Sequence, residues 1–197
     1  MTPSAQKIIL IGGSAGSYNL ILDILHVLPR KISSAICVVI HRNPNFDTQI
    51  EASLSRRLER NVISVVDKTE IHNNNIYFAP PGYHLLIEPD MTFSLDSSEP
   101  VNYSRPSIDV LFETTAEIYG KNCMAFLLSG ANTDGGKGLM SIDANGGKIF
   151  VQDPEEAAID TMPKYALEIN PNAKILSKAA IIDFFRNLDQ SYRNEKH

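Results

Sequence analysis

The feature that most constrains the fold is a series of short, continuous apolar runs, each followed by a stretch with helical periodicity. Residues 7–11 (KIILI) and 35–40 (AICVVI) are two such runs. Continuous apolar runs of this length are typical of strands buried on both faces of a parallel sheet. Between them, residues 18–28 place apolar side chains at helical spacing, and Pro29 ends that pattern. Strands that alternate with helices indicate βαβ units and a mostly parallel sheet covered on both faces.

The same alternation continues to the end of the chain. Further strands are predicted at 62–66, 123–128 and 148–151, and helices around 50–58, 106–119, 138–144, 155–169 and 178–188. The middle differs, because residues 76–95 contain turn signals at Pro80-Pro81-Gly82 and Pro89-Asp90. This stretch predicts short strands in an antiparallel hairpin region. We expect one α/β domain over residues 1–197, with its core at about 7–188.

The composition narrows the function classes. Hydrophobic residues make up 43% of the chain, which is enough for a sizeable core, and the net charge of −5 argues against nucleic-acid binding. Cys37 and Cys123 lie in apolar runs and are expected to be buried free thiols in a reducing compartment. We find neither a signal peptide nor about 18 consecutive apolar residues, so we expect a soluble cytoplasmic protein without membrane insertion.

The first candidate site follows the first strand. Residues 12–16 (GGSAG) match G-x-S-x-G between a predicted strand and a predicted helix. A sharp turn of this kind exposes the serine side chain, and the helix N-terminus offers N–H groups to a developing oxyanion. The simpler alternative is a tight turn in which Ser14 caps the helix.

Nucleotide binding is a minor possibility at this turn. A dinucleotide fingerprint that begins at Gly12 needs glycines at positions 14 and 17, where the chain has Ser14 and Ser17. The second strand also ends in His41-Arg42 rather than in an acidic residue that would hold a ribose. There is no G-K-[ST] to make a Walker A loop, and no cofactor is expected.

Two more polar residues follow buried strands. His41 follows residues 35–40, and Asp134 lies in the glycine-rich loop after residues 123–128. Either could be an ordinary polar group, and Asp134 could be a turn or N-cap residue. Parallel strands, however, end at one edge of the sheet, where Ser14, His41 and Asp134 would supply nucleophile, base and orienting carboxylate. The chain order differs from that of common α/β-hydrolases, and no metal-ligand spacing is present.

These motifs together resemble the catalytic domain of the chemotaxis protein-glutamate methylesterases, the CheB family. The resemblance covers about residues 7–185 and rests on six segments in the family's order: IGGSAGS (11–17), VVIHRNP (38–44), IYFAPPGYHLLI (76–87), RPSIDVLF (105–112), LLSGANTDGGKGL (127–139) and QDPEEAAIDTMPKYAL (152–167). It implies a three-layer α/β/α sandwich. It also implies a nucleophile at Ser14, a general base at His41 and an orienting aspartate at Asp134.

The implied substrate is a γ-glutamyl methyl ester on the cytoplasmic region of a methyl-accepting chemoreceptor, with glutamine deamidation in some members. Backbone amides of Ala15 and Ala131 are the expected oxyanion donors. Both positions depart from the family, which usually has a hydroxyl residue where this chain has Ala15 and often methionine where it has Ala131. Family members often carry an N-terminal receiver domain. This chain begins at the first catalytic strand, so we expect that control to be absent from it.

Two other functions remain open from the sequence. One is a non-catalytic signalling module that binds a receptor, and the other is a small-molecule esterase on the same scaffold. Arg42, Arg105 and the turn at residues 80–83 are candidates for the substrate lip, or are framework residues. The sequence does not indicate the particular receptor, the regulation or the oligomeric state.

Overall fold

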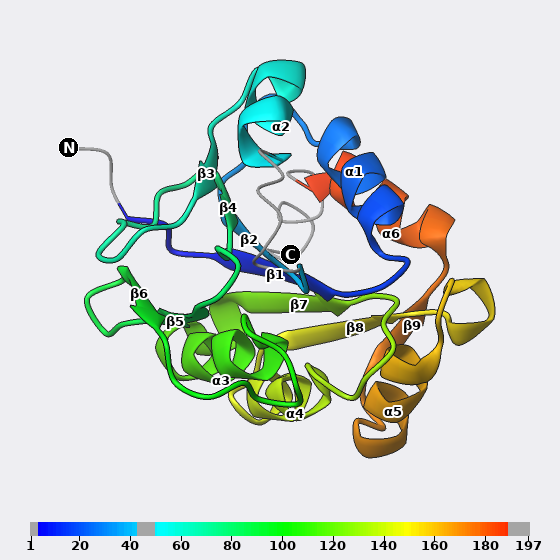
Figure 1. Ribbon diagram of the computed structural model, residues 1–197. Helices are drawn as coiled ribbons and strands as arrows, with labels where there is room; N and C mark the ends of the chain where they lie inside the picture. Colours follow the sequence, from blue (N-terminus) through cyan, green and yellow to red (C-terminus); the bar gives the residue numbers. More distant parts are fainter. Residues whose placement is uncertain (1–3, 43–49, 189–197) are drawn as a thin grey trace.

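A seven-stranded parallel sheet forms the centre of the molecule in a computed structural model, which describes residues 4–42 and 50–188 (Figure 1). The strand order is β3-β4-β2-β1-β7-β8-β9, and every neighbouring pair is parallel. The strands are β1 (Ile8–Gly13), β2 (Ala35–Ile40), β3 (Val62–Ser64), β4 (Ile76–Phe78), β7 (Cys123–Leu127), β8 (Lys148–Gln152) and β9 (Lys174–Leu176).

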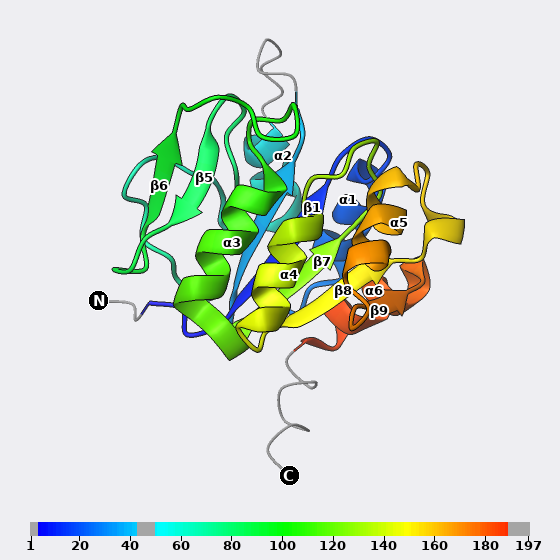
Figure 2. The same cartoon turned by 90° about the horizontal axis from the view of Figure 1, so that it is seen from below.

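Helices cover both faces of the sheet, as Figures 1 and 2 show. One face carries α1 (Tyr18–Val27), α2 (Ile50–Leu58) and α6 (Lys178–Arg186), and the other carries α3 (Ile108–Tyr119), α4 (Gly136–Ala144) and α5 (Thr161–Ile169). Because side chains alternate along a strand, β1 feeds two separate apolar cores. Ile8 and Leu10 pack in the core under α3, and Ile9 and Ile11 pack in the core under α1. The expected three-layer α/β/α sandwich is confirmed.

The antiparallel region is smaller than predicted. β5 (His84–Ile87) pairs with β6 (Phe93–Asp96) around the predicted turn at Pro89-Asp90. β4 is not part of this hairpin, because it joins the parallel sheet between β2 and β3. The turn at residues 80–82 therefore leads the chain out of the sheet and does not join two antiparallel strands.

Three other details differ from the sequence prediction. The helix expected at 155–169 is a 3₁₀ turn at Pro154–Glu156 followed by α5, and the edge strand β9 was not predicted. The helix expected from residue 106 begins at Ile108, with Ser107 as its N-cap. Cys37 and Cys123 are buried free thiols, as expected, and burial raises the pKa of both.

The sheet order brings the candidate residues together. β2, β1 and β7 are neighbours, and their carboxyl ends lie at one edge of the sheet. Ser14 follows β1, His41 follows β2, and the loop that contains Asp134 follows β7. This edge is where ligands bind in open α/β sheets.

Candidate active site

The turn after β1 holds Ser14 against the loop after β7. The Ser14 N–H donates to the Ser129 carbonyl oxygen (2.9 Å), and Ser129 Oγ donates to the Ala15 carbonyl oxygen (2.8 Å). Ser14 does not cap α1. The N-cap residue is Ser17, which makes no side-chain cap and instead donates its hydroxyl to the Ser14 carbonyl oxygen (2.7 Å). The Ser14 side chain is half-buried, and its hydroxyl has no hydrogen bond to the residues that the structure describes.

Two glycines allow this close approach. Gly16 has φ +83°, and a Cβ there would lie 2.5 Å from Ala158 Cβ. A Cβ on Gly130 would lie 2.4 Å from Met162 Cε and 3.1 Å from Ser14 Cβ. A side chain at Gly16 would also lie 2.9 Å from Ser129 Oγ of the β7 loop, whereas at Gly130 the contact with Met162 is to the flexible end of that side chain and the contact with Ser14 is the tight one. The glycines therefore keep the β7 loop in contact with Ser14.

His41 and Asp134 are directly hydrogen-bonded. His41 Nε2 lies 2.9 Å from Asp134 Oδ2, and the exposed fractions of the two side chains are 13% and 0%. His41 also continues the register of the sheet, since Gly13 pairs with Ile40 and the His41 N–H donates to the Gly13 carbonyl oxygen (3.2 Å). Ser14 and His41 are therefore adjacent residues at the ends of neighbouring strands, although no hydrogen bond joins their side chains in this structure.

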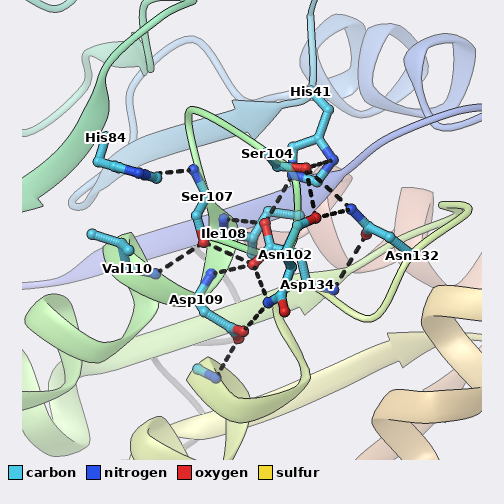
Figure 3. Close-up of polar contacts among 11 residues, drawn as sticks. His41, His84, Asn102, Ser104, Ser107, Ile108, Asp109, Val110, Asn132 and Asp134 are labelled. Carbon is cyan, nitrogen blue, oxygen red and sulfur yellow. Dashed lines mark hydrogen bonds and ion pairs between the residues drawn. The ribbon is translucent and has the colours of Figure 1, made fainter. Parts of the chain in front are cut away.

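The N-terminus of α3 surrounds the Asp134 carboxylate with donors (Figure 3). Oδ2 accepts from the Ile108 N–H (2.6 Å), and Oδ1 accepts from Ser107 Oγ (2.8 Å) and the Asp109 N–H (3.1 Å). Burial alone would raise the pKa of Asp134, but the hydrogen bonds from His41, Ile108 and Ser107 together lower it. The helix N-terminus favours the same negative charge. Asp134 is thus held as a carboxylate.

A second buried carboxylate lies beside the first. Asp109 Oδ1 accepts from the Gly138 N–H (2.7 Å), and Asn102 Nδ2 donates to Asp109 Oδ2 (3.0 Å) and to Asp134 Oδ1 (3.4 Å). Burial, opposed by the Gly138 hydrogen bond and assisted by the negative charge of Asp134, raises the pKa of Asp109 to about 6. The two acids share one amide but have pKa values shifted in opposite directions.

Sequence reasoning missed the residues that surround the His41–Asp134 pair. Ser104 Oγ lies 3.2 Å from His41 Nδ1, and Asn132 Nδ2 donates to Ser104 Oγ (3.1 Å) (Figure 3). Ser107 and Asp109 belong to the RPSIDVLF segment, so the distinctiveness of that segment was the available signal for them. Asn102 and Ser104 had no such signal, because their partners are 32 and 63 residues away in the chain.

Ala15 and Ala131, the expected oxyanion donors, are exposed on the two loops that flank Ser14. Within the part of the chain that the structure describes, neither backbone N–H is used in a hydrogen bond. Ala131 directly follows Gly130, where an added Cβ would lie 3.1 Å from Ser14 Cβ. The loops next to Ser14 therefore carry two backbone N–H groups that make no hydrogen bond within the described residues.

A cavity of about 400 Å³ opens beside the imidazole. Its lining residues are His41, Arg42, Gly82, Pro100, Tyr103, Ser104 and Arg105. Arg42 and Arg105, the predicted lip residues, are therefore at the cavity, together with Gly82 of the turn at residues 80–83. Arg42 Nη2 is paired with Glu51 Oε1 (2.6 Å), and Arg105 Nη1 donates to the carbonyl oxygens of Ser97 and Ser98 (2.7 Å each).

Among residues 4–42 and 50–188, no group of three or more His, Cys, Asp or Glu side chains is arranged to hold a metal ion. No helix in this described part has the length and apolar character needed to span a bilayer.

Comparison with known proteins decides the family. The family model described as CheB methylesterase matches residues 9–185. This chain belongs to the CheB methylesterase family. The CheB methylesterase catalytic domain of Thermotoga maritima, known from a crystal structure, superposes with a TM-score of 0.84 at 30% identity, over 92% of this chain and 98% of that one.

Two curated relatives differ in how much of their length this chain covers. A provisionally named protein-glutamate methylesterase/protein-glutamine glutaminase of Leptospira interrogans serogroup Icterohaemorrhagiae is 43% identical over 183 residues, which are 93% of this chain and 95% of the relative. The full-length Thermotoga maritima protein-glutamate methylesterase/protein-glutamine glutaminase is 32% identical over 82% of this chain but only 48% of its own length. The chain thus spans nearly all of one relative and about half of the other. The CheB family and the names of its members indicate carboxylic ester hydrolysis at glutamate.

Proposed function

We propose that this chain is a serine hydrolase that removes methyl groups from γ-glutamyl methyl esters on the cytoplasmic region of chemoreceptors. The observation that carries the proposal is the buried His41–Asp134 hydrogen bond at the strand end next to Ser14. Membership of the CheB methylesterase family supports the substrate class. The backbone amides of Ala15 and Ala131, which make no hydrogen bond to any described residue, support acyl transfer, since one oxyanion donor contributes on the order of 3–4 kcal/mol to catalysis.

The tautomer of the neutral imidazole follows from its hydrogen-bond partners. Asp134 is an ionised acceptor, so in the neutral ring His41 Nε2 carries the proton and Nδ1 has the lone pair. His41 Nδ1 is then the atom that takes the proton of Ser14. Asp134 fixes this tautomer and stabilises the imidazolium that forms.

The reaction proceeds by two acyl transfers. Ser14 Oγ gives its proton to His41 Nδ1 and attacks the ester carbonyl carbon, and the Ala15 and Ala131 amides bind the resulting oxyanion. The C–O bond to the methoxy group then breaks, and methanol leaves with the proton from His41. Water next gives a proton to His41 and attacks the acyl-enzyme, which releases the glutamate side chain and restores the Ser14 hydroxyl.

Glutamine deamidation is a second activity for the same residues. The relatives' names include protein-glutamine glutaminase, and the chemistry differs only in that ammonia leaves instead of methanol. Substrate choice then depends on how the cavity beside His41 accommodates the protein segment around the reacting side chain.

The test compares three substrates with the unaltered chain. Receptor membranes that carry isotopically labelled methyl esters report methanol release, unmethylated receptor with glutamine at the same sites reports ammonia release, and an aryl ester reports general esterase activity. We expect methanol release. Cleavage of the aryl ester alone would support a small-molecule esterase, and stable receptor binding without cleavage would support a signalling module; either result would refute the proposal.

A further inference from the structure

The hydroxyl that hydrogen-bonds the imidazole of His41 belongs to Ser104, not to Ser14. Ser104 Oγ lies 3.2 Å from His41 Nδ1, which is the ring nitrogen that does not contact Asp134. Ser104 is 8% exposed and lines the cavity beside His41. Because Nδ1 of the neutral ring is an acceptor, the Ser104 hydroxyl donates to it.

The position of Ser104 is fixed from two sides. Asn132, in the same loop as Asp134, donates through Nδ2 to Ser104 Oγ (3.1 Å) and to the Asn102 carbonyl oxygen (3.3 Å). Paired backbone hydrogen bonds between Val101 and Ser104 (3.1 and 2.9 Å) close a tight turn. The Ser104 hydroxyl is therefore positioned both by its own tight turn and by the loop that contains Asp134.

The turn that carries Ser104 has an uncommon backbone conformation. Its two central residues, Asn102 and Tyr103, have φ of 49° and 61°. Left-handed conformations cost energy for residues other than glycine, most of all for bulky ones, and persist where the surrounding structure holds them. Here the Asn102 side chain is bonded to Asp134, so the turn contacts both members of the His41–Asp134 pair.

We propose that Ser104 is a positioning residue for the general base. This inference rests on the proposed function and adds a group that acts through His41. In the resting protein the Ser104 hydroxyl donates a hydrogen bond to His41 Nδ1. This hydrogen bond fixes the plane of the ring and stabilises the Nε2–H tautomer that Asp134 also favours.

The hydroxyl also has a second direction in which to donate. Ser104 Oγ lies 3.5 Å from the Asn102 carbonyl oxygen, so a rotation of the hydroxyl moves its proton away from Nδ1. That rotation frees the Nδ1 lone pair for the proton of Ser14. Once Nδ1 is protonated, Ser104 Oγ is an acceptor that faces it at the same distance. Ser104 Oγ thus donates a hydrogen bond to the neutral ring and accepts one from the protonated ring.

The kinetic test compares Ser104→Ala with Ser104→Thr. Alanine removes the hydroxyl, and loss of one hydrogen bond to the base lowers kcat about threefold to tenfold with KM unchanged. Threonine retains a hydroxyl, so kcat returns to within about twofold of the unaltered protein. Ser98→Ala is the matched control, since Ser98 lies on the same connection but its hydroxyl, among the described residues, hydrogen-bonds only to the exposed Asp96.

A spectroscopic test does not depend on activity. In ¹⁵N spectra of the neutral ring, with His41 assigned by comparison with His41→Gln, the Nδ1 resonance moves downfield in Ser104→Ala because an unprotonated nitrogen has lost a hydrogen bond. It stays in place in Ser98→Ala. An unchanged resonance together with unchanged kcat in Ser104→Ala would overturn the inference.

Two other outcomes would also overturn it. A rise in KM at constant kcat would make Ser104 a substrate contact. Labelling of Ser104 instead of Ser14 by a serine-directed sulfonyl fluoride would make Ser104 the nucleophile. Absence of methylesterase activity in the unaltered chain would refute the proposed function, while the ¹⁵N comparison would still decide whether Ser104 holds Nδ1.

Discussion

Replacing Asp134 by asparagine removes one acceptor oxygen and one negative charge from a carboxylate that accepts five hydrogen bonds. In the unaltered protein, Oδ1 accepts three hydrogen bonds and Oδ2 accepts two; the donors are Ser107 Oγ, the Asp109 N–H and Asn102 Nδ2 on Oδ1, and His41 Nε2 and the Ile108 N–H on Oδ2. An asparagine amide has only one oxygen, so its NH₂ group must face donors in either orientation. With the oxygen on the three-donor side, the NH₂ faces Nε2 of His41.

Two effects of known size follow. A donor opposite Nε2 favours the Nδ1–H tautomer, which removes the lone pair that accepts the Ser14 proton, and the wrong tautomer lowers kcat by about 10⁴. Loss of the charge and of two hydrogen bonds at a fully buried site reduces the free energy of unfolding by about 2–4 kcal/mol. For a chain of this size the midpoint of thermal unfolding falls by roughly 5–15 °C.

The assay is methanol release at a temperature where both proteins are folded, with calorimetry on the same samples. Asp143→Asn is the matched control, because Asp143 is on the surface side of α4 and its carboxylate, within residues 4–42 and 50–188, accepts a hydrogen bond only from the exposed Asn172. It should change the free energy of unfolding by less than about 0.5 kcal/mol. Asp134→Asn with kcat within tenfold of the unaltered protein would refute the tautomer argument.

Two further predictions follow from neighbouring contacts. Because the pKa of Asp109 is raised to about 6 in the folded protein, this group binds protons more tightly in the folded than in the unfolded state. Its contribution to the free energy of unfolding therefore falls as pH rises from about 4 to 6. Asp109→Asn should flatten the dependence of the free energy of unfolding on pH, measured by urea titration, and an unchanged dependence would contradict the raised pKa of Asp109. Gly130→Ala places a methyl group 3.1 Å from Ser14 Cβ, while the flexible end of Met162 can move away from it. The substitution should therefore displace Ser14 and lower kcat about tenfold, with little change in the free energy of unfolding, and full activity would show that the β7 loop need not approach Ser14 so closely.

The sequence predicted the residues whose positions depend on strand order alone. Ser14, His41 and Asp134 each follow a buried strand, and β2, β1 and β7 turned out to be neighbours. Their proximity was predictable because parallel strands end at one edge. The two cores on either side of β1 were likewise implied by its continuous apolar run.

The surroundings of the imidazole were not predictable in this way. Ser104 reaches His41 because a tight turn with two left-handed residues closes over the sheet edge, and neither Asn102 nor Tyr103 is a glycine that would mark such a turn. β4 was assigned to a hairpin because the following Pro80-Pro81-Gly82 predicts a turn, and a turn signal does not specify which strand pairs with which. Long-range pairing decides both features.

The most direct test of the account is a single-turnover measurement of labelled methanol released from methylated receptor membranes by the unaltered chain and by Ser14→Ala. Circular dichroism on the same samples establishes that both proteins are folded. The account predicts release by the unaltered chain and a loss of at least a thousandfold in Ser14→Ala, because the nucleophile that forms the acyl-enzyme is gone. Equal release by the two proteins would contradict the assignment of Ser14, and no release by either would contradict the methylesterase function itself.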